Sequence, residues 1–423
     1  MSQTQTQSQP QPQTYSVTQL SPAALKRALG LIFFIMMMDV MGLGILAPVT
    51  PFIVGKYSTD AIMITLTTAL YAAAQFFAAP LFGKLGDRYG RRPVLLLSVL
   101  GSSIGYLIFG IGGALWVLLL SRLIDGFTGG NMSTASAYIA DVSRPEERAK
   151  NFTLIGMAYG LGFILGPALG GLFSRISLEA PIFAAAGLSL LSFLLGLFIL
   201  PESLPPARRE TASIRPGDLN PFGSIGMIAR KPGLGRFLMV LCLFEFAFNG
   251  INSITALFVA EKFAVEAWQI GLMMVVVGIA MAVVQAVIIP RIVPRYGEKA
   301  VAMIGLLGQA VGAVAMFLAP SFWLLFPVAM FTSAMSGFMF ASLGAFGANQ
   351  VSDREQGVLA GVTTALGSFM SIFGPLWAGL VYDRVMPSSP YWMGALVFIM
   401  ATLVMMQVKA AQATAGKEAW SAH

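Results

Sequence analysis

The feature that most constrains this chain is a series of long apolar runs separated by short polar segments. About 20 mainly apolar residues are enough to carry a helix across the hydrocarbon core of a bilayer. Only 11% of the residues are charged and 57% are hydrophobic, whereas a soluble domain carries roughly 25% charged residues. We therefore expect an all-α integral membrane protein. The predicted transmembrane helices are twelve, at 29–53, 62–82, 94–113, 115–140, 152–173, 180–200, 237–259, 268–290, 300–319, 321–348, 357–381 and 390–408.

The longest polar interruption divides these runs into six and six. The first run is too long for the apolar part of a signal peptide and lacks a small-residue cleavage site after it, so we expect it to be retained. The first residues form a Gln/Thr/Ser/Pro tract that cannot bury enough apolar surface to fold. The predicted parts are a disordered cytoplasmic tail at 1–22, a six-helix bundle at 23–200, a cytoplasmic linker at 201–236, a second six-helix bundle at 237–408 and a cytoplasmic tail at 409–423.

The basic residues indicate the orientation of these helices. With twelve spans, both termini and alternate loops lie on one side, and that side holds 21 of the 26 Lys and Arg residues. The loops on the other side hold four, and the remaining one, Arg122, lies inside a span. Because Lys and Arg accumulate on the cytoplasmic side of membrane proteins, we expect both termini in the cytoplasm and the chain in the plasma (inner) membrane.

The two halves repeat one another. Similar fragments recur 207 or 208 residues apart, each at the same place within its half. This spacing predicts two parallel six-helix repeats, pseudo-symmetric about a central cavity, as in transporters that move two halves about a midplane site. The matching fragments are Arg-Tyr-Gly at 88–90 and 295–297, Trp116 and Trp323, and Gly-Pro at 166–167 and 374–375.

Composition and motifs exclude several other functions. The net charge of +7 lies in loops between spans, which disfavours a nucleic-acid partner. The only histidine is His423 and the only cysteine is Cys242, so neither a metal site nor a histidine-dependent catalytic set can be built. No phosphate-binding Gly-x-x-x-x-Gly-Lys-Ser/Thr sequence occurs, which disfavours an ATP-driven pump. We expect no enzyme activity and no cofactor, with a proton gradient as the energy source.

The loop after the second span, 83–93, packs four cations and one acid into a tight turn. Its glycines permit the turn, and its aspartate can accept hydrogen bonds from an arginine or from a neighbouring helix N-terminus. We expect this loop to act as a cytoplasmic latch that holds one conformation. The residues of the predicted latch are Gly83, Asp87, Arg88, Gly90, Arg91 and Arg92.

This loop resembles the signature between helices 2 and 3 of the major facilitator superfamily. Three further segments match in the family's order: 121–126 is similar to the helix 4 arginine motif, 162–171 to the helix 5 signature of drug/proton antiporters, and 130–141 with 201–203 to bacterial tetracycline-resistance-type transporters. The resemblance covers most of the chain. It implies a secondary transporter, usually monomeric, that exports drugs in exchange for protons.

The helix 5 segment carries glycines at i, i+4 and i+8, so a neighbouring helix backbone can approach that face closely. A proline within it bends the helix or frees part of its hydrogen-bond ladder. Generic small-residue packing is the alternative, and the resemblance favours a gating helix that seals the cavity. The residues concerned are Gly162, Gly166, Pro167, Gly170 and Gly171.

Four charged residues lie inside spans: Asp39, Arg122, Asp125 and Glu245. A charge at the bilayer centre costs ~2.5–3.5 kcal/mol even on insertion scales, so such residues mark function. Asp39 and Glu245 stand at nearly equivalent places in the two halves, which predicts that both face the cavity. Burial favours the neutral form of a carboxyl group and a nearby cation favours the ionised form, so proton occupancy can change as helices move. We therefore predict proton coupling by all four residues, although Arg122 and Asp125 could instead neutralise one another.

The substrate cavity should be lined by polar and polarisable side chains near these charges. Lipid-facing or packed positions are the alternative for each of them. The candidates are Phe33, Met36, Met37, Gln75, Asn131, Asn249, Asn252, Gln285 and Gln309.

The chain departs from the proton-coupled tetracycline exporters in several places. That family carries additional acids in helices 3 and 9 and a histidine in helix 8, whereas 94–113 and 300–319 hold no acid and 268–290 holds no histidine. Tetracycline itself is therefore a disfavoured substrate. The second-half loop at 291–298 also lacks an aspartate matching Asp87, which makes the predicted latch asymmetric.

The main functional prediction is a secondary active exporter of amphipathic organic compounds or drugs, cations among them, by alternating access. Its partners would be the small-molecule substrate, protons and the lipid bilayer. One alternative is a proton-coupled importer of a sugar or organic acid, which would need a more polar cavity. Another is a membrane receptor or scaffold, which would need larger soluble segments than 1–22 and 201–236.

Overall fold

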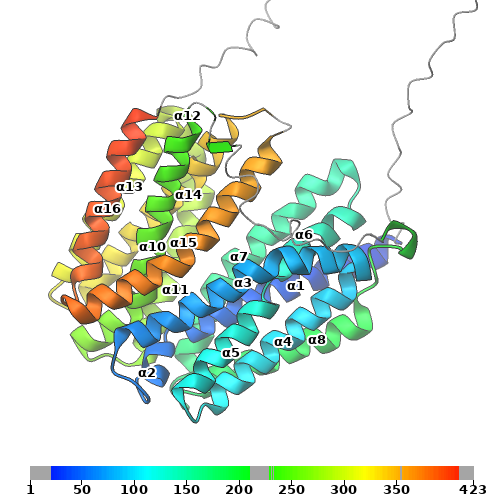
Figure 1. The fold of residues 1–423 in the computed structure, drawn as a ribbon, viewed down its shortest axis with the longest axis horizontal. Coiled ribbons are helices and arrows are strands. Elements are labelled where there is room, and N and C mark those ends of the chain that lie inside the picture. Colours follow the sequence, from blue (N-terminus) through cyan, green and yellow to red (C-terminus); the bar gives the residue numbers. More distant parts are fainter. Residues whose placement is uncertain (1–20, 210–227, 230, 232, 353–354, 409–423) are drawn as a thin grey trace, which may run out of the picture.

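The computed structural model describes residues 21–209, 228–229, 231, 233–352 and 355–408, and within them the chain is helical (Figure 1). Residues 1–20 of the predicted tail at 1–22, the predicted tail at 409–423 and most of the predicted linker lie outside these ranges. The first half contains α1 (Pro22–Leu46), α2 (Thr50–Val54), α3 (Ala61–Tyr89), α4 (Arg91–Ile111), α5 (Leu115–Thr128), α6 (Asn131–Val142), α7 (Pro145–Phe173) and α8 (Ala180–Ile199), followed by the short helix η1 (Pro206–Arg208). The second half contains α10 (Leu234–Phe263), α11 (Ala267–Val283), η3 (Val284–Ile288), α12 (Ile289–Tyr296), α13 (Glu298–Leu318), η4 (Phe322–Leu324), α14 (Leu325–Ala348), α15 (Gln356–Arg384) and α16 (Ser389–Gln407).

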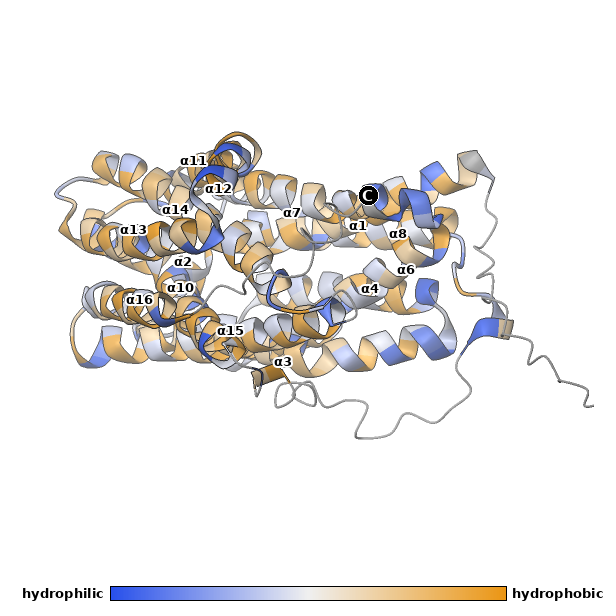
Figure 2. Ribbon diagram, turned by 90° about the horizontal axis from the view of Figure 1, so that it is seen from above, coloured by the Kyte–Doolittle hydropathy of each residue, from blue (hydrophilic) through white to orange (hydrophobic). Residues whose placement is uncertain are grey.

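The prediction of a twelve-span helical membrane protein is confirmed. Eleven helices in the described ranges are long and apolar enough to cross a membrane, with α11, η3 and α12 counted as one. The twelfth span is made by α5 and α6 together, each of which is too short alone. Figure 2 shows hydrophobic residues along the helices and hydrophilic ones gathered mainly at helix ends and loops.

The first span differs from the predicted range 29–53 at both ends. The helix α1 begins at Pro22, where the Ser21 hydroxyl accepts a hydrogen bond from Ala24 N at 3.3 Å. It ends at Leu46, before Pro48 and Pro51, and the short α2 follows. Proline lacks a backbone N–H and disfavours helix in the preceding residue, which explains the early end.

The fourth span is interrupted at Gly129 and Gly130, between α5 and α6. A Cβ atom on Gly130 would lie 3.1 Å from the Cα of Ala79 in α3, so the two chains cross there at a distance only glycine allows. The Gln75 side chain of α3 donates to Gly129 O at 2.9 Å and so satisfies a carbonyl group that the break exposes.

The eighth span is also irregular. The π-helical turn η3 lies between α11 and α12, and the Arg291 side chain donates to the carbonyl of Val287 within it. Two prolines, Pro290 and Pro294, follow closely, so the regular hydrogen-bond ladder is weakened in this part of the span.

The internal repeat predicted from sequence is present in the backbone. The helices α4 and α13 each have 21 residues and begin 207 positions apart, at Arg91 and Glu298. The glycine before each helix has a positive φ, +104° at Gly90 and +77° at Gly297. Such a φ is strained for residues with a side chain, so both halves use the same glycine-dependent turn.

The two halves form bundles that meet over only part of their length (Figure 1). The helix α3 packs along α15, and α7 packs along α11. Between α3 and α15 the contacts extend from Ile62 against Gly379 to the rings of Phe76 and Phe369, whose centroids are 6.0 Å apart. Between α7 and α11 they extend from Gly171 against Gly271 to Ile164 against Gly278. We call this the closed end.

The opposite end, where α6 and α12 finish, is where the bundles diverge (Figure 1). There a Cβ atom on Gly156 or Gly160 of α7, or on Gly357 or Gly361 of α15, would meet no atom within 4 Å. We call this the open end. Four cations were predicted for the side of the membrane with few basic residues. Each lies in the last turn of a helix, or just after it, at the closed end: Lys56, Arg175, Lys262 and Arg384.

Candidate functional site

Asp39 lies in the middle of α1, within a group of polar side chains contributed by three other helices. The Asn131 side chain, at the first position of α6, hydrogen-bonds the Asp39 carboxylate. Tyr71 of α3 and Tyr159 of α7 lie close enough to interact with Asp39 electrostatically. The break between α5 and α6 thus positions Asn131, which was predicted to line the substrate cavity, against the acid.

Arg122 and Asp125 form a buried ion pair one turn apart on α5. Arg122 Nη1 lies 3.1 Å from Asp125 Oδ2, and the two residues are 4% and 1% exposed. The guanidinium group also lies over the Phe109 ring, 4.6 Å from its centroid, and the Tyr106 ring, at 5.3 Å. Cation–π contacts stabilise a desolvated cation by about 2 kcal/mol or more.

The pair is not fully satisfied. Within the described ranges, Nε and Nη2 of Arg122 have no hydrogen-bond acceptor. Asp125 in turn interacts electrostatically with Asp39. A polar track therefore joins Asn131 and Asp39 to Asp125 and Arg122, and three of the four charged groups predicted inside the spans lie together in the first half. Unpaired buried donors are costly, so Arg122 is suited to binding a water molecule or another hydrogen-bond acceptor.

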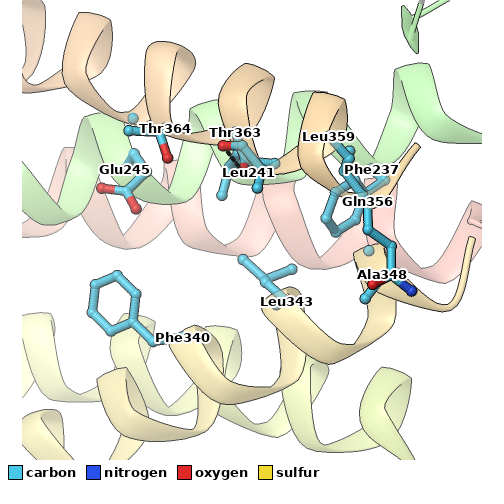
Figure 3. A pocket seen from close by; sticks show the side chains of 14 residues that line it. Phe237, Leu241, Glu245, Phe340, Leu343, Ala348, Gln356, Leu359, Thr363 and Thr364 are labelled. Atoms are coloured by element: carbon cyan, nitrogen blue, oxygen red, sulfur yellow. Dashed lines mark hydrogen bonds between the residues drawn. The ribbon is translucent and has the colours of Figure 1, made fainter. Parts of the chain in front are cut away.

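Glu245, the fourth charged residue, lies in α10 of the other half. Its Oε2 accepts a hydrogen bond from Asn249 Nδ2 at 2.9 Å, and the same amide donates to Glu245 O. The carboxylate lines a cavity between α10, α14 and α15 (Figure 3). The structure therefore does not bring Glu245 into the polar track of the first half.

Asp39 and Glu245 nevertheless occupy equivalent positions. Gly44 of α1 crosses α7 at Gly166, where a Cβ on Gly44 would lie 3.1 Å from the Gly166 Cα. Gly250 of α10 crosses α15 at Gly374, where a Cβ on Gly250 would lie 2.8 Å from the Gly374 carbonyl oxygen. Each acid precedes its crossing glycine by five residues. The register of the two crossings therefore makes the acids counterparts, as the repeat predicted.

The predicted gating helix is α7, and its glycines face two different partners. A Cβ on Gly162, Gly166 or Gly170 would lie 2.8 Å or less from atoms of α1. One on Gly171 would lie 3.1 Å from Trp268 O in α11, which belongs to the other half. The close backbone approach that the glycine spacing predicted is thus made to α1, next to Asp39, and Pro167 packs against Gly44.

The predicted latch loop makes its contacts within the first half. Arg91 Nη2 lies 2.6 Å from Asp87 Oδ1, and Arg91 Nε lies 3.4 Å from Asp141 Oδ2. Glu202, at the start of the predicted linker, accepts hydrogen bonds from Arg91 N at 2.9 Å and Leu204 N at 3.0 Å. The loop, the end of α6 and the start of the linker are therefore joined, while Asp87 makes no ion pair with the second half in the described ranges.

Other latch residues have different surroundings. Arg92 Nη2 donates to Leu197 O at 2.6 Å, which ties α4 to α8. Arg88 is exposed and lies over the Tyr89 ring, 5.5 Å from its centroid. A Cβ on Gly83 would come no nearer than 3.6 Å to Ser133. The charge network is therefore centred on Arg91.

The remaining predicted cavity residues are dispersed. Gln309 is buried between α13 and α14, where its amide donates to Thr332 O at 2.9 Å and Ser336 Oγ at 2.5 Å. Asn252 is exposed and bonds its own helix at Phe248 O, and Gln285 is exposed within the π-turn η3. Met36 is buried in the core of the first half, against which Phe33 and Met37 pack. Gln75 bonds Gly129 O and Tyr71 Oη at the break.

Several residues of the site were not singled out from sequence. Tyr71 and Tyr159 were missed because nothing in their local sequence distinguishes them from packing aromatics. Asp141 and Glu202 lay in matched segments but were given no role of their own. The local signal is their position, one and two residues after the predicted spans that end at 140 and 200.

Two six-helix bundles that each hold a buried carboxyl group, packed together at one end and separated at the other, define a secondary transporter of the alternating-access type. The sequence model of the Major Facilitator Superfamily matches residues 32–297 and 256–421. The chain belongs to this superfamily.

Relatives and solved structures agree with this assignment. The chain is 35% identical to the class C tetracycline resistance protein of Escherichia coli, over 91% of this chain and 95% of that protein. It is 26% identical to multidrug resistance protein 2 of Bacillus subtilis (strain 168), over 83% and 89%. The fold resembles the crystal structure of a bacterial homologue of the human lysosomal transporter Spinster in an inward-facing and occupied conformation, with a TM-score of 0.73, 16% identity and coverage of 92% and 97%.

Proposed function

We propose that this chain is a proton-coupled exporter of amphipathic organic compounds, and that Asp39 is the principal proton-carrying group. The observation that carries the proposal is the polar track of the first half. Asp39 is held by the neutral side chain of Asn131 and lies near Asp125, whose own charge is balanced by Arg122. A buried acid without a cationic partner favours its protonated form, and exposure to water favours its ionised form, so a change of conformation can load or release its proton.

The tetracycline and multidrug resistance relatives support export over the import alternative. Tetracycline remains a compound to test, because the acids and the histidine that the tetracycline exporters carry in helices 3, 8 and 9 are absent from the matching spans of this sequence. We propose no cofactor, a monomer as the working unit and the proton gradient as the energy source. One elementary charge moved through the membrane potential supplies ~2.3 kcal/mol per 100 mV.

For orientation, we propose that the open end faces the cytoplasm. The support is the asymmetry of the basic residues, 21 of which lie in the termini and loops of that side. The conformation is then inward-facing, with the Asp87–Arg91 pair confined to the first half. In the outward-facing state, the predicted latch would be free to engage α15 from across the open end.

The test uses purified protein in liposomes that enclose a pH-sensitive dye. Ethidium and tetracycline are added in turn, and substrate-dependent proton movement is recorded. We expect proton movement with at least one compound for the unchanged protein and its loss in Asp39→Asn. Protein-free liposomes and an Asp60→Asn variant, in which an exposed closed-end acid is changed, are the controls.

Undiminished substrate-dependent proton movement in Asp39→Asn would contradict the coupling role. Transport of either compound without any proton movement in the unchanged protein would contradict proton coupling as such and leave a passive carrier.

A further inference from the structure

The cavity that contains Glu245 has a volume of about 410 Å³ and lies in the open-end half of the second bundle. Figure 3 shows Glu245 on α10 opposite Phe340 on α14, with Thr364 of α15 beside Glu245 and Thr363 beside Leu241. Most of the lining is apolar or aromatic. Glu245 is the only charged residue among the residues that line it.

The two halves differ at the position that flanks each acid. In the first half this position is occupied by Tyr159, which interacts with Asp39. The Gly-Pro pairs of α7 and α15 are 208 positions apart, and the residue 208 positions after Tyr159 is Gly367. A Cβ on Gly367 would lie 3.7 Å from the Glu245 carboxyl carbon. The aromatic side chain that interacts with Asp39 thus has no counterpart at the matching position beside Glu245, where Gly367 lines the cavity instead.

Glu245 also lacks a cationic partner. Its polar contact in the described ranges is with the neutral Asn249 amide, and no Lys or Arg lies within ion-pair distance of it there. Arg122, the one cation in the centre of a span, pairs with Asp125 in the other bundle. A buried carboxylate in an apolar cavity is stabilised strongly by any cation that enters, because desolvation strengthens their attraction.

We propose that Glu245 is the specificity-determining residue for the cationic group of a lipophilic organic cation, and that the cavity between α10, α14 and α15 holds the apolar body of that molecule. The proposal rests on the proposed transport function and assigns Glu245 a role different from that of Asp39. Phe340 supplies an aromatic wall facing the carboxylate, where the cation can contact both. The volume is within the range of about 300–1,000 Å³ that small-molecule sites occupy.

The test is equilibrium binding to the purified full chain in detergent. Binding is measured by calorimetry at about pH 8, where carboxylates are ordinarily ionised. The probes are tetraphenylphosphonium, a permanent cation, and triphenylphosphine oxide, a neutral molecule with a similar aryl surface. For Glu245→Gln we expect the affinity for the cation to fall about tenfold or more and that for the neutral probe to change less than about threefold, since only the charge is removed. Glu245→Asp should recover most of the affinity for the cation.

The matched control is Glu261→Gln, the same chemical change on the same helix, at a carboxylate that accepts a hydrogen bond from Tyr382 near the closed end and lies outside the cavity. It should bind both probes as the unchanged chain does. A Phe340→Leu variant should weaken both probes, because the aromatic wall contacts their aryl groups.

Three results would overturn the proposal: no binding of tetraphenylphosphonium by the unchanged chain, undiminished binding by Glu245→Gln, or equal loss of both probes in that variant. Binding needs neither a pH gradient nor turnover. Glu245-dependent binding without substrate-driven proton movement would therefore contradict the proposed proton coupling and leave this site intact. Substrate-driven proton movement without Glu245-dependent binding would contradict this site and leave the proton coupling intact.

Discussion

The Asp383 carboxylate, in the last turn of α15, caps the first turn of α3 in the opposite half. Its two oxygens accept hydrogen bonds from Ala61 N and Ile62 N, each at 2.9 Å. A carboxylate at a helix N-terminus satisfies free N–H groups and favours the positive end of the helix dipole. These bonds can exist only while the closed end is closed, so Asp383 stabilises the observed conformation against its alternative.

Asp383→Ala should therefore shift the population toward opening of the closed end. Losing an N-cap costs about 1 kcal/mol, which corresponds to ~fivefold in the conformational equilibrium. The reporter is a cysteine at Thr65, which is fully buried against Gly379, in a chain whose Cys242 is replaced by alanine. Its reaction rate with a membrane-impermeant maleimide should rise severalfold.

The matched control is Asp60→Ala. Asp60 precedes α3 directly, yet its side chain makes no capping bond to that helix. An equal rate increase in both variants would show that the effect comes from local fraying of α3 and not from the contact between the halves.

Gly166→Ala should disrupt the crossing of α1 and α7. The added methyl would lie 2.7 Å from Met41 O and 2.8 Å from the Gly44 Cα, both backbone atoms that cannot rotate away. Overpacking of this kind costs about 1–3 kcal/mol. Thermal unfolding in detergent should show a lower Tm, and transport should fall because α1 carries Asp39.

Gly160→Ala provides the comparison on the same helix, since its methyl would meet no atom within 4 Å. We expect its Tm to be unchanged or slightly raised, because alanine is the better helix former. A drop in Tm as large as that of Gly166→Ala would mean that helix composition, and not the α1–α7 crossing, sets the effect.

The latch loop should depend on Arg91 far more than on Arg88. Arg91 is 8% exposed and pairs with Asp87 and Asp141, so Arg91→Ala would leave two carboxylates without their cation. Because the two carboxylates are themselves 31% and 22% exposed, water can replace part of the lost interaction, and the cost should be about 1–3 kcal/mol. Arg88→Ala removes an exposed cation and should cost less than about 0.5 kcal/mol. Thermal unfolding of the two variants checks this, and similar losses would contradict the network as described.

The pair formed by Lys56 and Glu179 at the closed end should give a pH-dependent contribution to stability. The hydrogen bond from Lys56 holds the pKa of Glu179 below its ordinary value. A lowered folded-state pKa contributes stability above the unfolded-state value, and this stability is lost as the pH falls through the folded-state pKa. Solvent screening limits the contribution to about 1 kcal/mol.

Glu179→Gln should therefore lower the Tm slightly at about pH 7, and its Tm should converge with that of the unchanged chain only as the pH falls through the lowered folded-state pKa of Glu179. A gap in Tm that persists at low pH would assign the effect to packing instead of charge.

Much of the fold follows from sequence because the bilayer allows few alternatives. Apolar length gave the number of spans, and the 207-residue repeat placed Gly90 and Gly297 at equivalent turns. The break at Gly129 and the π-turn at Val284 were not predicted, because both lie where a neighbouring helix comes close: α3 approaches Gly130, and α14 approaches Val284 at Gly337. Hydropathy averages over such interruptions.

The candidate site was predictable in its charges and less so in its geometry. A charge inside an apolar run is conspicuous, so Asp39, Arg122, Asp125 and Glu245 could be named. Polar amides such as Gln309 are as common in helix packing as in cavities, and only the structure separates the two. The Asp383 cap joins residues more than 320 positions apart, which no local pattern reports.

The most direct measurement of the central claim compares two kinds of transport by Asp39→Asn in liposomes, with the compound that gives proton movement in the unchanged chain. One assay imposes a pH gradient and records accumulation of the compound above its equilibrium level. The other records exchange of labelled for unlabelled compound with no gradient. If proton binding at Asp39 couples transport, the variant should exchange at a measurable rate and accumulate nothing. Accumulation by Asp39→Asn equal to that of the unchanged chain would contradict the account.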